Sequence, residues 1–124
     1  MKKISILFIL GAICGLSACK KRPSAGLGGQ ASLNISLKHH GLLIDSGRIF
    51  IKFNALDAPT EYDLNQDVDR TDGITAITGL KKGDYYLYAN GWDPNILSNV
   101  EGGIPFSIIE ETKYDLVIPV TEEH

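Results

Sequence analysis

The side chains whose types and spacing could most readily do chemistry form an acidic run near the middle of the chain. Oxygen-bearing side chains alternate there at Asp63, Asn65, Asp67 and Asp69. Alternating oxygen ligands suit a hard cation such as calcium. An EF-hand loop counted from the first of them would need glycine at its sixth position and glutamate at its twelfth, where this chain has Val68 and Ile74. We interpret the run as a solvated acidic loop, with calcium binding as the alternative.

A histidine pair, His39 and His40, is the next candidate, because imidazoles can bind zinc or move protons. Both residues lie at the end of a predicted strand, and adjacent strand residues point to opposite faces of a sheet. We therefore do not expect them to share a metal ion. The pair is interpreted as a polar strand end that turns at Gly41, so no firm metal site and no cofactor other than a covalent lipid is predicted.

The only tryptophan, Trp92, opens the longest stretch without strand periodicity, which runs to Gly103. Loops at the ends of sheets often bind ligands, and an indole beside polar groups can stack on a sugar or anchor a protein partner. Trp92, Asp93 and Asn95 are therefore a candidate ligand loop. The alternative is that Trp92 covers the core and the rest is a plain connection.

The elements that must position these residues are β-strands, since apolar and polar residues alternate with a period of two after the first thirty positions. Strands are predicted over residues 31–38, 48–54, 60–64, 74–80, 85–90, 104–109 and 113–120. Turn signals such as Asp72-Gly73 and Lys82-Gly83-Asp84 separate them. No helical period follows Cys19. Seven short strands punctuated by turns indicate an all-β, antiparallel sandwich.

Residues 71–89 carry a more specific pattern: an Asp-Gly turn, a strand ending at Leu80, a glycine turn at Gly83 and a strand rich in tyrosine. This segment resembles the prealbumin-like (transthyretin-like) sandwiches of carboxypeptidase regulatory-like and Cna-B-like domains. The resemblance implies that Leu80 fills the core at a corner and that Tyr85 packs between two sheets.

The same architecture hosts hydroxyisourate hydrolases, which end in Tyr-Arg-Gly-Ser, whereas this chain ends Val120-Thr121-Glu122-Glu123-His124. No serine, cysteine or lysine nucleophile with a recognisable activating partner is evident either. Cna-B-like domains can carry a Lys-Asn isopeptide bond, but the predicted last strand, residues 113–120, holds no asparagine. We therefore predict no catalytic residues, no enzymatic activity and no crosslink.

A localisation signal precedes the strands. Leu16-Ser17-Ala18-Cys19 follows a short apolar run behind Met1-Lys2-Lys3, and it resembles a bacterial lipoprotein signal with its lipobox. The resemblance implies cleavage before Cys19, which then carries a diacylglyceryl thioether and an amide-linked fatty acyl chain such as palmitate. The apolar run is shorter than the roughly 20 residues that a stable membrane span needs. The alternative is an ordinary secretory signal that leaves Cys19 as a free thiol.

The expected organisation is one folded domain behind a membrane anchor. It comprises a signal peptide at 1–18, a lipidated cysteine and flexible glycine-rich spacer at 19–30, a sandwich at 31–120 and a disordered tail at 121–124. From Pro23 onward there are seven basic and fifteen acidic residues, a net charge of −8. An acidic domain argues against nucleic acid as a partner, because phosphate recognition needs a basic surface.

These features predict a lipid-anchored envelope protein that acts as a non-enzymatic protein-binding or assembly module. The basic residues 20–22 after Cys19 favour the outer membrane with the domain facing the periplasm. The expected partner is another envelope protein. Two alternatives stay open: a glycan-binding lipoprotein of a polysaccharide-uptake system that uses the Trp92 loop and, less favoured, a transthyretin-like hydrolase.

Overall fold

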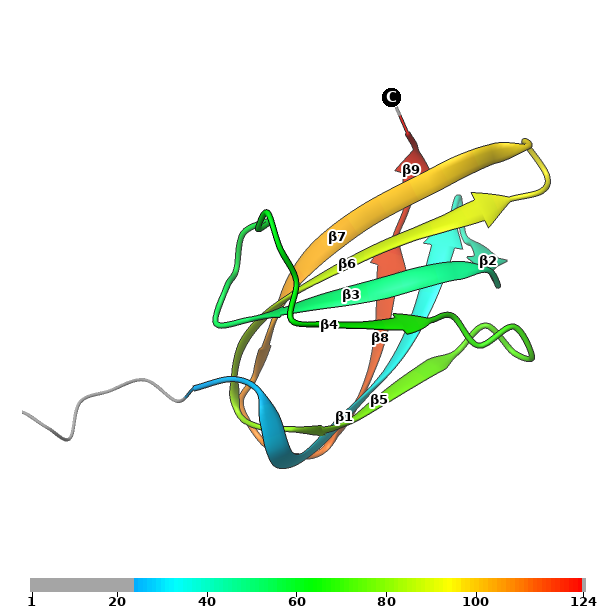
Figure 1. Cartoon of the computed structure of the whole chain (residues 1–124). Helices are drawn as coiled ribbons and strands as arrows, with labels where there is room; N and C mark the ends of the chain where they lie inside the picture. Colours follow the sequence, from blue (N-terminus) through cyan, green and yellow to red (C-terminus); the bar gives the residue numbers. More distant parts are fainter. Residues whose placement is uncertain (1–23, 124) are drawn as a thin grey trace, which may run out of the picture.

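The computed structural model describes residues 24–123, which form two β-sheets packed face to face (Figure 1). The predicted signal segment 1–18, the predicted lipidation site Cys19 and the terminal His124 lie outside the described residues. Within the described part of the chain, no helix has the length and apolar character needed to cross a membrane. The all-β prediction is confirmed for these residues.

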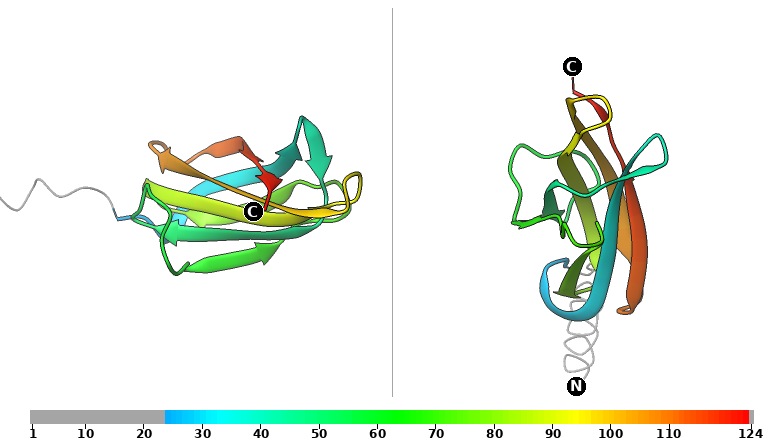
Figure 2. Two further views of the ribbon diagram at one scale, coloured as in Figure 1. Left: turned by 90° about the horizontal axis from the view of Figure 1, so that it is seen from above. Right: turned by 90° about the vertical axis from the view of Figure 1, so that its right-hand side faces the viewer.

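Nine strands form between residues 24 and 123. They are β1 (Leu27–His39), β2 (Leu42–Ile44), β3 (Gly47–Phe53), β4 (Leu64–Asp67), β5 (Thr75–Leu80), β6 (Gly83–Asp93), β7 (Ser98–Ile108), β8 (Lys113–Pro119) and β9 (Thr121–Glu122). The first sheet, sheet A, has the order β2-β1-β5, with β8 beside β1. The second, sheet B, has the order β4-β3-β6-β7-β9. Figure 2 shows the two layers from two further directions.

Strand pairing is antiparallel in both sheets with one exception, the parallel pair of β1 and β8. In that pair Ser32 lies opposite Lys113, and Lys38 lies opposite Pro119. A parallel pair requires a long crossover between its strands. Here four of the five strands of sheet B lie within the crossover, because β3, β4, β6 and β7 come between β1 and β8 in the chain.

The core lies between the sheets and follows the alternation of the sequence. Inward-facing side chains with no exposed surface include Ala31, Leu33, Ile35, Leu37, Ile49, Ile51, Leu87 and Ala89. Burying one such large aliphatic side chain stabilises a fold by about 1.5 to 3 kcal/mol. Leu80 and Tyr85 are also fully buried, as the resemblance implies.

The prediction of a flexible spacer is wrong for residues 25–30, because this segment packs against one end of the sandwich. The Ala25 N–H donates to Asn54 Oδ1 at 2.9 Å, and the Gly26 N–H donates to the Tyr85 hydroxyl at 3.0 Å. A Cβ atom on Gly29 would clash with the Leu80 carbonyl. Gly29 therefore serves close backbone approach here, and the composition that is typical of a linker instead marks a docked segment.

Two predicted strands, the predicted tail and one connection also need correction. The expected disordered tail contains β9, whose Glu122 pairs with Val100. The candidate strand at 60–64 is displaced to β4, and β2 was not expected at all. β7 begins at Ser98, six residues before the predicted start at 104. The pattern hides these residues because Gly102 and Gly103 interrupt the apolar alternation. Glycine is needed at 102, since a Cβ there would clash with the Pro119 carbonyl.

Candidate functional site

The outer surface of sheet B carries an unusual number of aromatic side chains. In β3 and β6 these are the residues that alternate with the buried ones, and Phe50 lies directly opposite Tyr88. Tyr62 joins them from the connection between β3 and β4. We call this surface the aromatic face; it consists of Phe50, Tyr62, Tyr86, Tyr88 and Trp92.

Three rings in the middle of the aromatic face pack on one another. The ring centroids of Phe50 and Tyr62 lie 5.6 Å apart, and those of Phe50 and Tyr88 lie 5.7 Å apart. Tyr62 and Tyr88 stack at 5.8 Å with an interplanar angle of 22°. Such pairs stabilise one another by about 0.5 to 1.5 kcal/mol beyond the area they bury. The cluster therefore holds half-buried aromatic rings in fixed positions on a sheet surface.

A glycine on β7 shapes the neighbouring part of the face. A Cβ atom on Gly103 would clash with the ring and hydroxyl of Tyr86. The Tyr86 ring therefore lies directly against the backbone of Gly103, where any larger residue would displace the ring.

Polar and charged groups surround the rings. Arg48 forms an ion pair with Asp67 at 2.8 Å, and Lys52 lies 3.6 Å from Asp63. The Tyr88 hydroxyl donates to Glu101 Oε1 at 2.6 Å. Burial, followed by this bond to the carboxylate, raises the pKa of Tyr88 well above its usual range. Tyr88 is therefore a neutral donor at physiological pH.

Two shallow hollows lie on this side of the molecule. One, of about 520 Å³, is lined by Phe50, Lys52, Asn65 and residues 60–63. The other, of about 450 Å³, surrounds the exposed indole of Trp92 and is lined by Ser46, Gly47, Asn90, Gly91, Asn99 and Glu123. Each combines an aromatic ring with hydrogen-bonding side chains, which is the chemistry of a binding surface.

The calcium candidates have partners within the chain. Asp63 accepts the Phe53 N–H at 2.8 Å, and Asp69 accepts the Thr71 N–H at 2.9 Å. Asp67 and Asn65 both accept from the Arg48 guanidinium. Among residues 24–123, Asp63, Asp67 and Asp69 belong to no group of three or more histidine, cysteine, aspartate or glutamate side chains whose ligand atoms lie close together. Calcium binding stays the untested alternative, and the contacts give these side chains structural roles.

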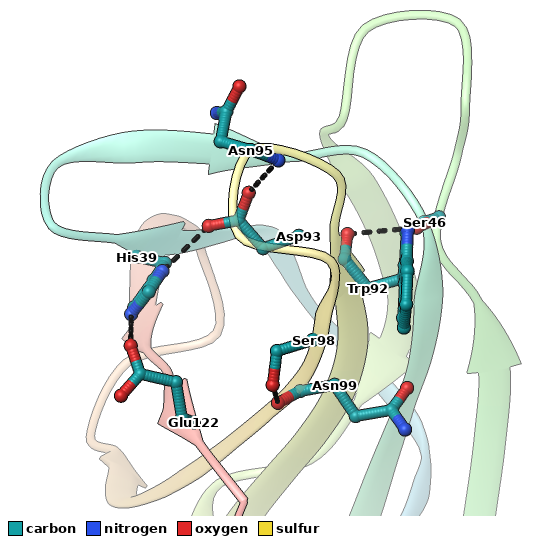
Figure 3. A network of polar contacts seen from close by, with 8 residues as sticks. All are labelled: His39, Ser46, Trp92, Asp93, Asn95, Ser98, Asn99 and Glu122. Carbon is teal, nitrogen blue, oxygen red and sulfur yellow. Dashed lines mark hydrogen bonds and ion pairs between the residues drawn. The ribbon is translucent and has the colours of Figure 1, made fainter.

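The candidate ligand loop is divided by the sheet. Trp92 and Asp93 belong to β6, and the turn itself spans residues 94–97. Trp92 points outward and is 42% exposed, so it does not cover the core. Asp93 points inward and is 2% exposed, while the Asn95 N–H donates to its Oδ1 at 2.9 Å (Figure 3). The loop is therefore a tight hairpin that begins with Trp92 on the outer surface of sheet B and Asp93 in the interior.

Asp93 meets a buried histidine at this end of the sandwich. His39 Nδ1 lies 2.7 Å from Asp93 Oδ2, and His39 Nε2 lies 3.2 Å from Glu122 Oε1 (Figure 3). His39 is 2% exposed. The hydrogen bond from His39, aided by the Asn95 N–H, lowers the pKa of Asp93. His39 is thus held between two carboxylates that come from β6 and β9.

His40 lies beside this group, contrary to the expectation that the two histidines face opposite sides of the sheet. Strand alternation does not apply to it, because His40 and Gly41 form the two-residue turn between β1 and β2, with φ of 51° and 80°. The ring centroids of His39 and His40 lie 4.2 Å apart. We call His39, His40, Asp93 and Glu122 the histidine cluster.

Local sequence patterns do not reveal the histidine cluster or the aromatic face. His40-Gly41 stands between an alternating run and the apolar residues 42–44, and both residue types tolerate the positive φ of a two-residue hairpin turn, so this dipeptide could have placed His40 in a turn. No local signal places Glu122, which reaches the cluster through the pairing of β9 with β7. Comparison of the chain with models of known protein families and with curated proteins finds no match.

Proposed function

We propose that this chain is a lipid-anchored, non-enzymatic binding module of a bacterial envelope, and that the aromatic face is its contact surface for another envelope protein. The observation that carries the proposal is the fixed set of half-buried rings on the outer surface of sheet B. The anchor is the one that the lipobox at residues 16–19 predicts, and the outer membrane facing the periplasm is the compartment that its flanking residues favour.

The composition of the face supports a protein partner. Tyrosine, tryptophan and arginine dominate the binding energy of protein interfaces. Here three tyrosines and Trp92 lie on one surface, with Arg48 at the margin beside Phe50. Core positions of known interfaces are depleted in charge, while their rims are polar. The ring cluster with Arg48–Asp67 and Lys52–Asp63 around it has this arrangement.

The partner's surface should be basic, since the chain from Pro23 onward has a net charge of −8. Opposite charges accelerate association and exclude like-charged competitors. We further propose that the sandwich is of the prealbumin-like type. Its support is the burial of Leu80 and Tyr85 and the positive φ of Gly73, 76°, in the Asp-Gly turn.

Site-specific photocrosslinking in intact bacteria tests the contact surface. A photoreactive phenylalanine analogue at Phe50 or Tyr62 should yield a discrete crosslinked product with one envelope protein. The matched control places the analogue at Val117, which is 45% exposed on the outer surface of sheet A. Equal yields from both surfaces, or no product from the aromatic face, would contradict the proposal.

The anchor is tested separately. Metabolic labelling with an alkynyl fatty acid should label the native chain, and Cys19→Ser should abolish the label. Mass spectrometry that finds a free thiol at Cys19 in native material would contradict a lipid anchor. That result would leave the crosslinking test of the aromatic face intact.

A second candidate function, glycan capture, is favoured by the hollow around Trp92. An exposed indole can stack on a sugar ring, and the amides of Asn90 and Asn99 line the same hollow. Affinity electrophoresis in gels containing bacterial or plant polysaccharides would detect such binding. Retardation that is lost in Trp92→Ala and kept in Ile96→Ala, a control at an exposed residue of the adjacent turn, would support a glycan ligand.

A further inference from the structure

The hydrogen bonds of His39 fix which of its ring nitrogens is available for binding. Asp93 is buried, and its other carboxylate oxygen, Oδ1, accepts the Asn95 N–H at 2.9 Å, so the carboxylate is placed as a hydrogen-bond acceptor. His39 Nδ1, 2.7 Å away, must therefore carry a proton. In a neutral imidazole the other nitrogen, Nε2, then presents a lone pair.

The lone pair of His39 Nε2 faces a second electron-rich atom. Glu122 Oε1 lies 3.2 Å from it. Two such atoms at this distance need a positive charge between them, either a proton or a metal ion. Zinc bound tetrahedrally at about 2.0 to 2.2 Å separates neighbouring ligand atoms by roughly 3.3 to 3.5 Å. The observed spacing is close to one edge of such a tetrahedron.

His40 supplies a third ligand. Potential ligand atoms of His39, His40 and Glu122 all lie within 4.8 Å of one another. His39 is buried, while His40 and Glu122 are exposed. His39, which Asp93 orients, is thus the fixed ligand. The exposed side chains of His40 and Glu122 can move by the remaining ångström or so that is needed to bind an ion.

We propose that His39, His40 and Glu122 bind one divalent transition-metal ion of the zinc class, and that Asp93 is a positioning residue that orients His39. Two imidazoles and one carboxylate are ligands that zinc accepts, whereas calcium and magnesium prefer oxygen. A carboxylate that accepts the second N–H of a metal-bound histidine is the usual outer support of such sites. Three protein ligands leave the fourth position to water.

The ion would add a bond between the β1–β2 turn and β9, close to the hydrogen bond that the Val120 N–H donates to the Lys38 carbonyl at 2.9 Å. β9 has two residues and pairs with β7 through Val100–Glu122 and Glu101–Thr121. The β1–β2 turn lies on sheet A. A metal bridge from His39 and His40 to Glu122 therefore ties sheet A to the last strand of sheet B. This inference is independent of the proposed partner-binding role of the aromatic face.

Isothermal titration calorimetry with zinc chloride tests the site. The sample is the full chain without a histidine tag, purified in detergent and freed of metal with EDTA. Cys14→Ser and Cys19→Ser remove the thiols, which bind zinc themselves. One zinc ion per chain should bind, and the melting temperature should rise with zinc, while magnesium at the same concentration should leave it unchanged.

Variants identify the ligands. Glu122→Gln and His40→Asn should each weaken zinc binding by at least about 100-fold. Loss of a residue that only hydrogen-bonds to a ligand weakens metal binding by about 100-fold at most, so a direct ligand should cost at least that much. Asparagine suits position 40 because it tolerates positive φ. Both residues are exposed, so the fold should survive. Glu123→Gln, the same change one residue later, is the matched control and should bind zinc normally. Asp93→Asn should weaken binding about 10- to 100-fold.

Nuclear magnetic resonance of the ring nitrogens separates the metal site from a simple ion pair. On zinc addition, the His39 Nε2 resonance should shift to the position of a metal-bound nitrogen, while Nδ1 keeps its proton. The proposal is overturned if zinc fails to bind at millimolar concentration. It is equally overturned if Glu122→Gln and Glu123→Gln bind zinc alike.

Discussion

His39 and Asp93 are separated by 54 positions in the chain, yet their Nδ1 and Oδ2 atoms lie 2.7 Å apart in the interior. The contact forms where the last residues of β1 and β6 meet at one end of the sandwich. Glu122 of β9 reaches the same end. Three chain segments from both sheets thus converge on one buried imidazole, whereas the aromatic face is built from neighbouring strands of one sheet.

Trp92→Ala should change the free energy of unfolding by no more than about 0.5 kcal/mol, because the indole is 42% exposed and lies outside the core. Leu87→Ala, which removes a fully buried side chain from the same strand, should cost about 2 to 5 kcal/mol. Urea denaturation of both variants measures the difference. A large loss of stability in Trp92→Ala would show that the tryptophan supports the core after all.

Gly29→Ala should destabilise the fold by about 1 to 3 kcal/mol, because the new methyl group meets the Leu80 carbonyl. Gln30→Ala, a change at the next residue with an exposed side chain, is the control and should be nearly neutral. Thermal unfolding of the two variants distinguishes a docked segment from a flexible spacer. A flexible spacer would tolerate both substitutions equally.

Tyr85→Phe should destabilise the fold by about 1 to 3 kcal/mol while keeping the ring in the core. The lost hydroxyl donates to the Lys81 carbonyl at 2.7 Å and accepts the Gly26 N–H at 3.0 Å. Both backbone groups would lose a buried partner. Tyr86→Phe, on the outer surface, should change stability far less, and chemical denaturation of the pair provides the comparison.

Stability should fall as the pH rises above 10. Burial raises the pKa of Tyr85 and of Tyr88 above the ordinary tyrosine value of 10.0. Below pH 10 both hydroxyls keep their protons in the folded and unfolded chains. Above it the unfolded chain loses protons that the folded chain retains, and this difference favours unfolding. Urea midpoints measured across this range should decline less steeply in Tyr88→Phe than in the parent chain.

Calcium should leave the melting temperature unchanged at about 5 mM, a concentration above the dissociation constants of roughly 1 mM found for weak extracellular calcium modules. The reason is that Asp63 and Asp69 accept backbone N–H groups, while Asp67 pairs with Arg48. A calcium-dependent increase that EGTA reverses would restore the calcium interpretation of this acidic run.

The sequence was sufficient to predict most of the strands, because their signal is local. Ala31, Leu33, Ile35 and Leu37 alternate with polar residues, and all four are fully buried in β1. The same is true of Leu87 and Ala89 in β6. Glycine removed this signal in β7, and β9 is too short to show any periodicity.

The candidate site was harder to predict, because its members meet through pairing between distant strands. Alternation places Tyr86, Tyr88 and Trp92 on one side of β6, but only the pairing with β3 brings Phe50 opposite Tyr88. His40 was misjudged because a turn residue was treated as a strand residue. Asp93 was grouped with Trp92 although successive strand residues face opposite sides.

The docking of Ala25 limits how far the domain can stand from a bilayer. Only five residues separate it from Cys19, and a fully stretched chain across those six steps reaches about 20 Å. With acyl chains on Cys19, the Asn54 and Tyr85 end would sit just above the headgroups. From Ala31, where the register shifts of β1 end, the strand runs about 26 Å away from there, toward His39. The histidine cluster and the β6–β7 turn would then occupy the membrane-distal tip (Figure 1), accessible to soluble ions, while the aromatic face would be presented sideways to neighbours anchored in the same leaflet.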